Sequence, residues 1–116
     1  MNAEYATAEP TRDEVDAMQE PVLLEFGTSW CGWCRSAQPF IARVLQDHPN
    51  VRHIKVEDGP GRPLGRSFRV KLWPTLIFLK QGQELARVTR PSDPQSLRQA
   101  LQQIDPQPAT AQSSRA

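Results

Sequence analysis

The segment Val22–Gly27 constrains the fold of this chain most strongly. Its sequence, VLLEFG, is apolar at nearly every position rather than at every second one. A strand of this kind must be covered on both faces, as at the centre of a sheet that lies between layers of helices. The run also contains one acidic residue, Glu25, whose place in a buried strand needs an explanation of its own.

The patterns around this strand predict a layered α/β domain. Beyond a loop at 28–32, apolar residues from Ala37 to Leu45 have the spacing of a helix with one buried face, and Pro39 falls inside it. The other predicted elements are a helix from Thr11 to about Gln19, strands at 51–57, 75–79 and 84–89, a loop at 58–65 with a short helical turn after it, and a last helix capped by Asp93. This order predicts a three-layer α/β fold with a mixed sheet.

Length and charge limit the function classes. With 116 residues, of which 38% are hydrophobic, the chain can bury one core, which we assign to residues 11–104. Residues 1–10 are predicted to be a flexible N-terminus and residues 105–116 a disordered tail. The net charge of +1 argues against nucleic acid as a partner, and no segment resembles a membrane span or a signal peptide. We therefore expect a monomeric, cytoplasmic protein with no membrane partner.

Two cysteines, Cys31 and Cys34, lie where the buried strand gives way to the following helix. A disulfide between them closes almost no loop and stabilises little, so chemistry explains the pair better than structure does. A helix N-terminus favours a thiolate, and Arg35 acts in the same direction. We therefore predict that Cys31 is a nucleophile and that Cys34, one turn later, resolves its mixed disulfides.

Two interpretations of Glu25 stay open. An acidic side chain in the strand leading to the cysteines can accept a proton from Cys34 as that thiol attacks. Alternatively, Glu25 points to an edge of the sheet or pairs with an arginine or lysine.

Several motifs in order resemble the thioredoxin family over about 22–104. They are WCGWC at 30–34, the LLEFG strand before it, Pro39 in the helix, Trp-Pro-Thr at 73–75 and KQGQE at 80–84. The resemblance implies a thioredoxin-like fold in which Cys31 is the exposed nucleophile and Cys34 the buried resolving thiol. It also implies that Pro74 is the family's cis-proline, and that Glu25 occupies the buried acidic position, where thioredoxin itself has aspartate.

The resemblance further implies that substrates dock on the loops around the cysteine pair. The predicted substrate-binding residues are Trp30, Gly32, Trp33, Trp73, Pro74 and Thr75. Trp33 stands where thioredoxin has proline, Trp73 where a smaller aliphatic residue is usual, and Arg90-Pro91 where a glycine lines the docking groove. The family's lysine near the buried acid has two candidate matches, Lys55 and His53, because the register of their strand is open.

Together these features predict a thiol–disulfide oxidoreductase that reduces or exchanges protein disulfides through the Cys31–Cys34 redox-active disulfide, with no other cofactor and no metal. The resemblance implies thioredoxin reductase or glutathione as the electron donor. The alternatives are a thioredoxin-like binding or redox-sensing module without turnover, and an oxidant or isomerase if the protein is exported. A glutaredoxin-like interpretation is weaker, because the motif lacks that family's proline and tyrosine.

Two further patterns have competing interpretations. His48 and His53 follow the cysteines at zinc-finger spacing, but Pro49 ends the helix between them, so we interpret His48 as a solvent-facing helix end and His53 as a strand residue. A basic series before Trp73 is either a solvated face or a bias toward acidic partners. Its members are Arg62, Arg66, Arg69 and Lys71.

Overall fold

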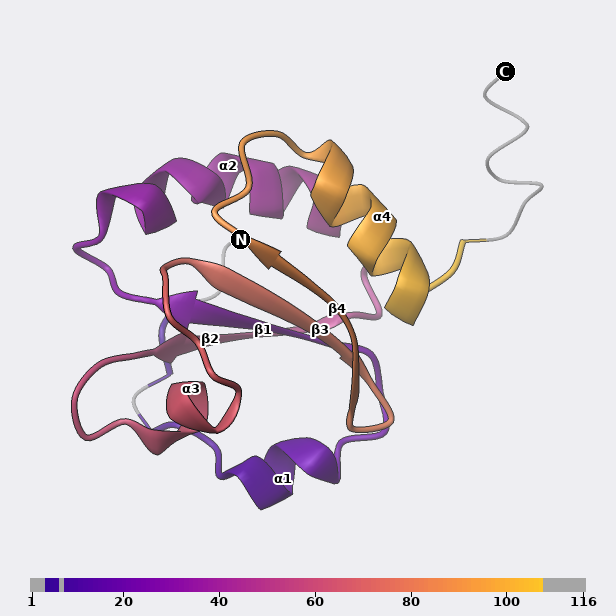
Figure 1. The fold of residues 1–116 in the computed structure, drawn as a ribbon. Coiled ribbons are helices and arrows are strands. Elements are labelled where there is room, and N and C mark those ends of the chain that lie inside the picture. Colours follow the sequence, from indigo (N-terminus) through magenta and orange to yellow (C-terminus); the bar gives the residue numbers. More distant parts are fainter. Residues whose placement is uncertain (1–3, 7, 108–116) are drawn as a thin grey trace.

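A mixed four-stranded sheet forms the centre of the computed structural model, which describes residues 4–6 and 8–107 (Figure 1). The strand order is β2-β1-β3-β4. The strands are β1 (Val22–Gly27), β2 (Arg52–Glu57), β3 (Thr75–Lys80) and β4 (Gln83–Thr89). β1 pairs in parallel with β2 and antiparallel with β3, which pairs antiparallel with β4. The predicted central strand is therefore central, and all of its residues are buried.

Helices cover both faces of this sheet, which confirms the predicted three layers (Figure 1). Helices α2 (Gly32–Leu45) and α4 (Gln95–Ile104) lie on one face, and α1 (Arg12–Asp16) and α3 (Pro63–Ser67) lie on the other. Each face has its own apolar cluster, because successive side chains of β1 point to opposite sides. Leu23 packs with α2 and α4, whereas Leu24 packs with Val15 and Leu64.

Local sequence features explain how the elements begin and turn. Thr11 and Glu14 form the predicted capping box, with Glu14 N donating to Thr11 Oγ1 at 3.0 Å and Thr11 N donating to Glu14 Oε1 at 2.8 Å. The helix ends at Asp16, three residues earlier than predicted. In the β3–β4 turn, Gly82 has a φ of +75°, and a side chain there would collide with the Asp16 carbonyl oxygen, so the turn requires glycine.

The N-terminal segment corrects one prediction. Tyr5 forms a parallel bridge with Lys55, and Ala6 N donates to Lys55 O at 2.9 Å. A wholly flexible segment at 1–10 was therefore the wrong expectation for these residues. The physical reason is that β2 is an edge strand, whose outer backbone groups are open for pairing.

The C-terminal tail and His48 give a second correction. His48 is 5% exposed, and its Nδ1 lies 2.9 Å from Asp105 Oδ2 and 3.1 Å from Gln107 Nε2. His48 is thus buried rather than solvent-facing, and residues 105–107 pack against it. The rest of the predicted tail, 108–116, lies outside the described residues. None of the helices in the described part of the chain is long and apolar enough to cross a membrane.

Candidate active site

The cysteine pair lies at the start of α2, immediately beyond the end of β1. Cys31 is the N-cap residue of this helix and Cys34 lies in its first turn. The backbone N–H of Cys34 donates to Cys31 Sγ at 3.3 Å. A backbone donor and the helix dipole are therefore both placed to stabilise negative charge on the Cys31 sulfur.

The two sulfurs differ in their access to solvent. Both cysteines are free thiols, and Cys31 is 8% exposed whereas Cys34 is 1% exposed. Burial raises the pKa of Cys34 to about 12, with further contributions from its hydrogen bond to Cys31 and from the nearby charges of Cys31 and Glu25. Cys34 is consequently held as a thiol while Cys31 remains reduced.

Glu25 lies behind the pair in a network of hydrogen bonds. Its side chain is fully buried, Oε1 lies 2.8 Å from His53 Nε2, and Oε2 accepts a hydrogen bond from Gln38 Nε2 at 2.7 Å. The same Gln38 nitrogen donates to the Cys34 carbonyl at 2.9 Å, and Lys55 Nζ donates to Gln38 Oε1 at 3.1 Å. Glu25 thus neither points to an edge nor pairs directly with an arginine or lysine.

The same network contains both candidates for the family's lysine near the buried acid, His53 and Lys55. Glu25 lies opposite Lys55 in the β1–β2 ladder, yet its direct partner is His53, and Lys55 joins through Gln38. Sequence reasoning missed Gln38 as a site residue. The signal that identifies it is its position four residues after Cys34, one turn along α2 on the same helix face.

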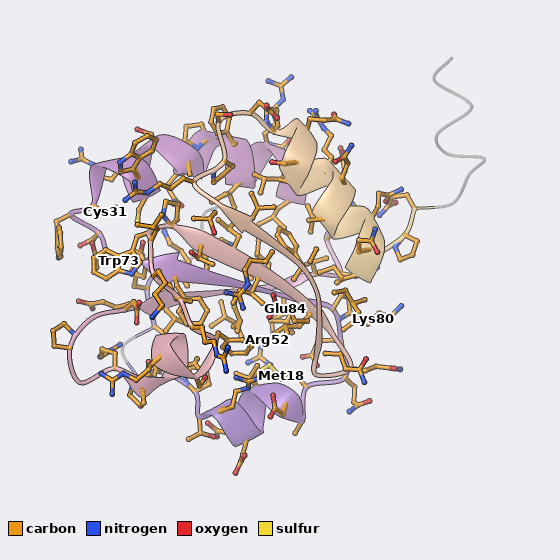
Figure 2. The ribbon with its side chains drawn as sticks, in the orientation of Figure 1. Met18, Cys31, Arg52, Trp73, Lys80 and Glu84 are labelled. Atoms are coloured by element: carbon orange, nitrogen blue, oxygen red, sulfur yellow. The ribbon has the colours of Figure 1, made fainter. Side chains whose placement is uncertain are left out.

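An aromatic rim surrounds the more exposed sulfur. Trp30 is 71% exposed and Trp33 57% exposed, and the rings of Trp30 and Trp73 meet edge to face with their centroids 5.7 Å apart. Cys31 and Trp73 lie at the same end of the sheet, away from Lys80 and Glu84 at the hairpin turn (Figure 2). We call Trp30, Trp33 and Trp73 the tryptophan rim; two of its side chains are exposed and that of Trp73 is half-buried.

The loop before β3 places the other predicted docking residues at different depths. The Trp73–Pro74 peptide bond is cis. Pro74 and Thr75 are buried, and the Thr75 hydroxyl donates to the Leu72 carbonyl at 2.6 Å. Gly32 is exposed, with nothing close to its α-carbon on the side-chain side. Of the predicted docking residues, Trp30, Gly32 and Trp33 are therefore exposed, whereas Pro74 and Thr75 lie beneath the surface.

Arg90, in the loop after β4, contacts the loop before β3 and the first turn of α2. Its Nε donates to the Trp73 carbonyl at 2.8 Å, its guanidinium carbon lies 4.8 Å from the centre of the Trp33 ring, and its backbone N–H donates to the Pro74 carbonyl at 2.9 Å. The sequence marked Arg90 as a departure from the family pattern but did not reveal these contacts. A cation over an indole and a charged donor on a carbonyl both favour a fixed rim.

The basic series borders a cavity of about 600 Å³. Its lining includes Arg62, Arg66, Arg69 and Lys71 together with Asp58. Asp58 Oδ2 also accepts a hydrogen bond from Trp73 Nε1 at 2.9 Å, so the cavity adjoins the tryptophan rim.

The zinc alternative finds no support in the described residues. His48 pairs with Asp105 and His53 with Glu25. Over 4–6 and 8–107, no three His, Cys, Asp or Glu side chains come together as a candidate metal site.

A dithiol at a helix N-terminus, backed by a buried acid and flanked by a cis-proline loop, places the protein in the class of thioredoxin-fold redox domains. The Thioredoxin family model matches residues 3–103, and the chain belongs to this family.

Individual relatives agree with that assignment. Thioredoxin 2 from Pseudomonas aeruginosa PAO1, solved in its reduced form, is 54% identical, with a TM-score of 0.81 over 90% of this chain and 96% of that chain. Thioredoxin f2 from Chlamydomonas reinhardtii, 24% identical with a TM-score of 0.69 over 83% of this chain and 90% of that one, shares the fold. Thioredoxin H1 from Arabidopsis thaliana is 36% identical over 67 residues, 58% of this chain and 59% of the relative. The matched segment thus spans about three-fifths of such curated relatives.

Proposed function

We propose that this protein is a thiol–disulfide oxidoreductase that reduces or exchanges protein disulfides through Cys31 and Cys34. The observation that carries the proposal is the asymmetric pair itself. The Cys34 N–H donates to Cys31 Sγ at 3.3 Å, and the Cys34 sulfur lies buried behind it. One sulfur is placed to meet a partner, and the other is placed to attack the first.

The reaction follows from this asymmetry. The Cys31 thiolate attacks one sulfur of a substrate disulfide, the substrate S–S bond breaks, and its other sulfur leaves as a thiolate that takes up a proton. Cys34 then loses its proton and attacks Cys31 Sγ, which forms the Cys31–Cys34 disulfide and releases the second substrate thiol. Two electrons have passed from the dithiol to the substrate.

The timing of the second step has a physical basis in the Cys34 environment. Its raised pKa of about 12 depends in part on the hydrogen bond to Cys31 and on the negative charge of Cys31. Both contributions disappear when Cys31 is bound in a mixed disulfide. Cys34 therefore becomes more acidic at the step that needs its thiolate, and Glu25 is the nearby carboxylate that can take the proton.

The partners and location extend this proposal. The electron donor is thioredoxin reductase or glutathione, the protein acts as a monomer in the cytoplasm, and it has no resident cofactor beyond its own disulfide. What supports these points is the family membership. A binding module without turnover is not favoured, since both thiols are present and free.

The preferred protein substrates carry acidic residues near their disulfides. The support for this is the cavity lined by Arg62, Arg66, Arg69 and Lys71 beside Trp73. Reversing Arg66 and Arg69 to glutamate should raise KM for an acidic substrate and weaken its salt dependence. Unchanged rates and salt dependence would refute this preference and leave the redox activity intact.

The first experiment is a redox titration against glutathione. Tryptophan fluorescence serves as the readout, because Trp30 and Trp33 flank the cysteines in the sequence. A two-electron transition near the cytosolic glutathione poise of roughly −220 to −320 mV supports a reductase. A potential toward roughly −180 mV or above supports an oxidant or isomerase instead. Partner binding that survives Cys31→Ser, without any reversible redox transition, would replace the enzyme by the binding module.

A further inference from the structure

Tyr5, to which the proposed reaction assigns no role, lies beside the buried thiol of Cys34. Gly27 ends β1 directly beneath the sulfur, and a β-carbon there would lie 2.5 Å from Cys34 Sγ and 3.1 Å from the Tyr5 hydroxyl oxygen. The Tyr5 hydroxyl and the Cys34 sulfur therefore approach the same point at the end of β1 and lie close to each other. The N-terminal segment thus reaches the neighbourhood of the resolving thiol.

Tyr5 is held in this position by three separate contacts. Its backbone forms the bridge with Lys55, the next N–H donates to the Lys55 carbonyl at 2.9 Å, and the Lys55 ammonium lies 4.5 Å from the centre of the Tyr5 ring. Lys55 also donates to Gln38, which donates to Glu25. Tyr5 therefore belongs to the same polar cluster as the buried acid, although it is far from it in sequence.

The surroundings make Tyr5 a donor rather than a base. Burial, reinforced by the nearby charges of Glu25 and Cys34, raises the pKa of Tyr5, so its phenol keeps its proton whenever Cys34 ionises. Tyr5 and Cys34 line a common cavity of about 430 Å³. The charged and titratable groups around the pair are Glu4, Glu25, Cys31, Arg35, Lys55 and Glu57.

We propose that Tyr5 is a positioning residue for the resolving step, whose hydroxyl donates a hydrogen bond to Cys34 Sγ and stabilises the thiolate that attacks the mixed disulfide. The proton of Cys34 goes to the Glu25 side of the cluster or to solvent, and the Tyr5 proton stays in place. The S–S bond that forms joins Cys34 to Cys31, and the bond that breaks joins Cys31 to the substrate. This inference rests on the proposed dithiol chemistry and adds a residue to it.

The test uses Tyr5→Phe, which keeps the ring on Lys55 and removes only the hydroxyl. We expect the mixed disulfide with glutathione to resolve about tenfold more slowly, the size expected when one donor to a developing charge is lost. The first attack by Cys31 should be unchanged, and the pH at which resolution reaches half its maximal rate should rise. Rapid acid quench followed by mass analysis separates the two steps.

A second variant keeps the proposal testable if Tyr5→Phe perturbs the fold. The chain contains one tyrosine, so biosynthetic incorporation of 3-fluorotyrosine changes residue 5 alone. Its more acidic phenol is a stronger donor and should speed resolution and lower the pH of its midpoint. The single ¹³Cζ signal of labelled Tyr5 should also shift between the reduced protein and the protein with the Cys31–Cys34 disulfide.

The outcomes separate this inference from the proposed function. Resolution at the unmodified rate in both variants at every pH, with normal dithiol turnover, overturns the role of Tyr5 and leaves the oxidoreductase intact. Failure of the unmodified protein to form or resolve a mixed disulfide overturns the proposed function itself. A slower first attack in Tyr5→Phe would also overturn the inference, since it would show a general structural effect.

Discussion

The exposed and buried sides of the active site are composed of different types of side chain. Around Cys31 lie tryptophan rings and an arginine, with Trp30 71% and Trp33 57% exposed. Around Cys34 lie a fully buried carboxylate and its amide and histidine partners. The exposed side offers apolar area and one fixed cation to a partner, whereas the buried side offers groups that hold and move a proton.

Under the proposed function, this difference assigns partner recognition and proton handling to separate residues. The two sides meet at the cysteines, where the Cys34 N–H donates to Cys31 Sγ at 3.3 Å. Substitutions on the buried side should therefore change the resolving step, and substitutions on the rim should change the affinity for partners.

The largest effect is expected from Gly27→Ala. The added β-carbon would lie 2.5 Å from Cys34 Sγ, so the sulfur must move away from its line of attack. We expect resolution to slow by about a hundredfold, in line with the cost of roughly 1 Å misplacement, and stability to fall by about 1–3 kcal/mol from overpacking. Quenched single-turnover assays and urea unfolding measure the two effects.

A matched control lies on the other side of the cysteines. Gly32 is exposed and a β-carbon there meets nothing within 4 Å. Gly32→Ala should therefore leave the resolving rate and the stability close to those of the unmodified protein. Equal effects of the two substitutions would contradict the argument from close approach.

Removal of the buried charge should have the next largest effect. Glu25→Gln keeps the size of the side chain and its place beside Gln38 and His53 but cannot accept a proton from Cys34. We expect resolution at neutral pH to slow by some tens of fold, toward the lower end of what general base catalysis contributes. The attack by Cys31 on a model disulfide should change little.

The control is Glu20→Gln, which removes an exposed carboxylate 3.2 Å from Arg52. It should affect neither step. A Glu25→Gln protein that resolves mixed disulfides at the normal rate would assign the buried acid a purely structural role.

The sequence predicted the site where the determining signals are local. The apolar run of β1, the cysteine spacing and the capping box are patterns of neighbouring residues, and each matches the structure. The pairing of Glu25 with His53 joins residues 28 positions apart. It depends on the register between β1 and β2, which periodicity alone leaves open.

The features that sequence reasoning missed are contacts between segments that are distant in the sequence. Tyr5 reaches Cys34 because β2 is an edge strand, and the tail reaches His48 because α4 ends beside it. Arg90 was noticed only as an unexpected residue type, since its contacts to Trp33 and Trp73 cross two loops. In each case a polar side chain far away in sequence satisfies a group that local patterns leave without a partner.

The raised pKa of Cys34 should make the free energy of unfolding of the reduced protein depend on pH. Its folded-state pKa of about 12 lies above the ordinary value of 9.0. As the pH rises between these values, the unfolded chain loses the proton first, so this group's contribution to stability is complete below pH 9 and is lost toward pH 12. The slope is up to about 1.4 kcal/mol per pH unit.

Reduced Cys34→Ser provides the comparison, because its hydroxyl does not titrate in this range while Tyr5 is kept. Urea unfolding of the two reduced proteins between pH 8 and pH 10.5 should show the unmodified protein losing stability faster. Parallel curves would mean that burial does not disfavour the Cys34 thiolate in the folded state.

The smallest effect is expected from Arg90→Ala, on the exposed side. The substitution removes the cation over Trp33 and the donor to the Trp73 carbonyl, so both rings lose a restraint. A fixed rim binds partners with less loss of side-chain freedom. We therefore expect KM for a protein disulfide to rise about fivefold, with the resolving rate unchanged, while Arg87→Ala, which removes only an exposed contact to Glu84, should leave both values alone.

The direction of the KM change distinguishes two roles of Arg90. A rise means that the guanidinium holds the rim in the form that partners bind. A fall would mean that Arg90 competes with the partner for the Trp73 carbonyl and acts as a cover on the docking surface. A change in the resolving rate instead would break the separation between the two sides, because a rim residue would then control the chemistry of a sulfur that is 1% exposed.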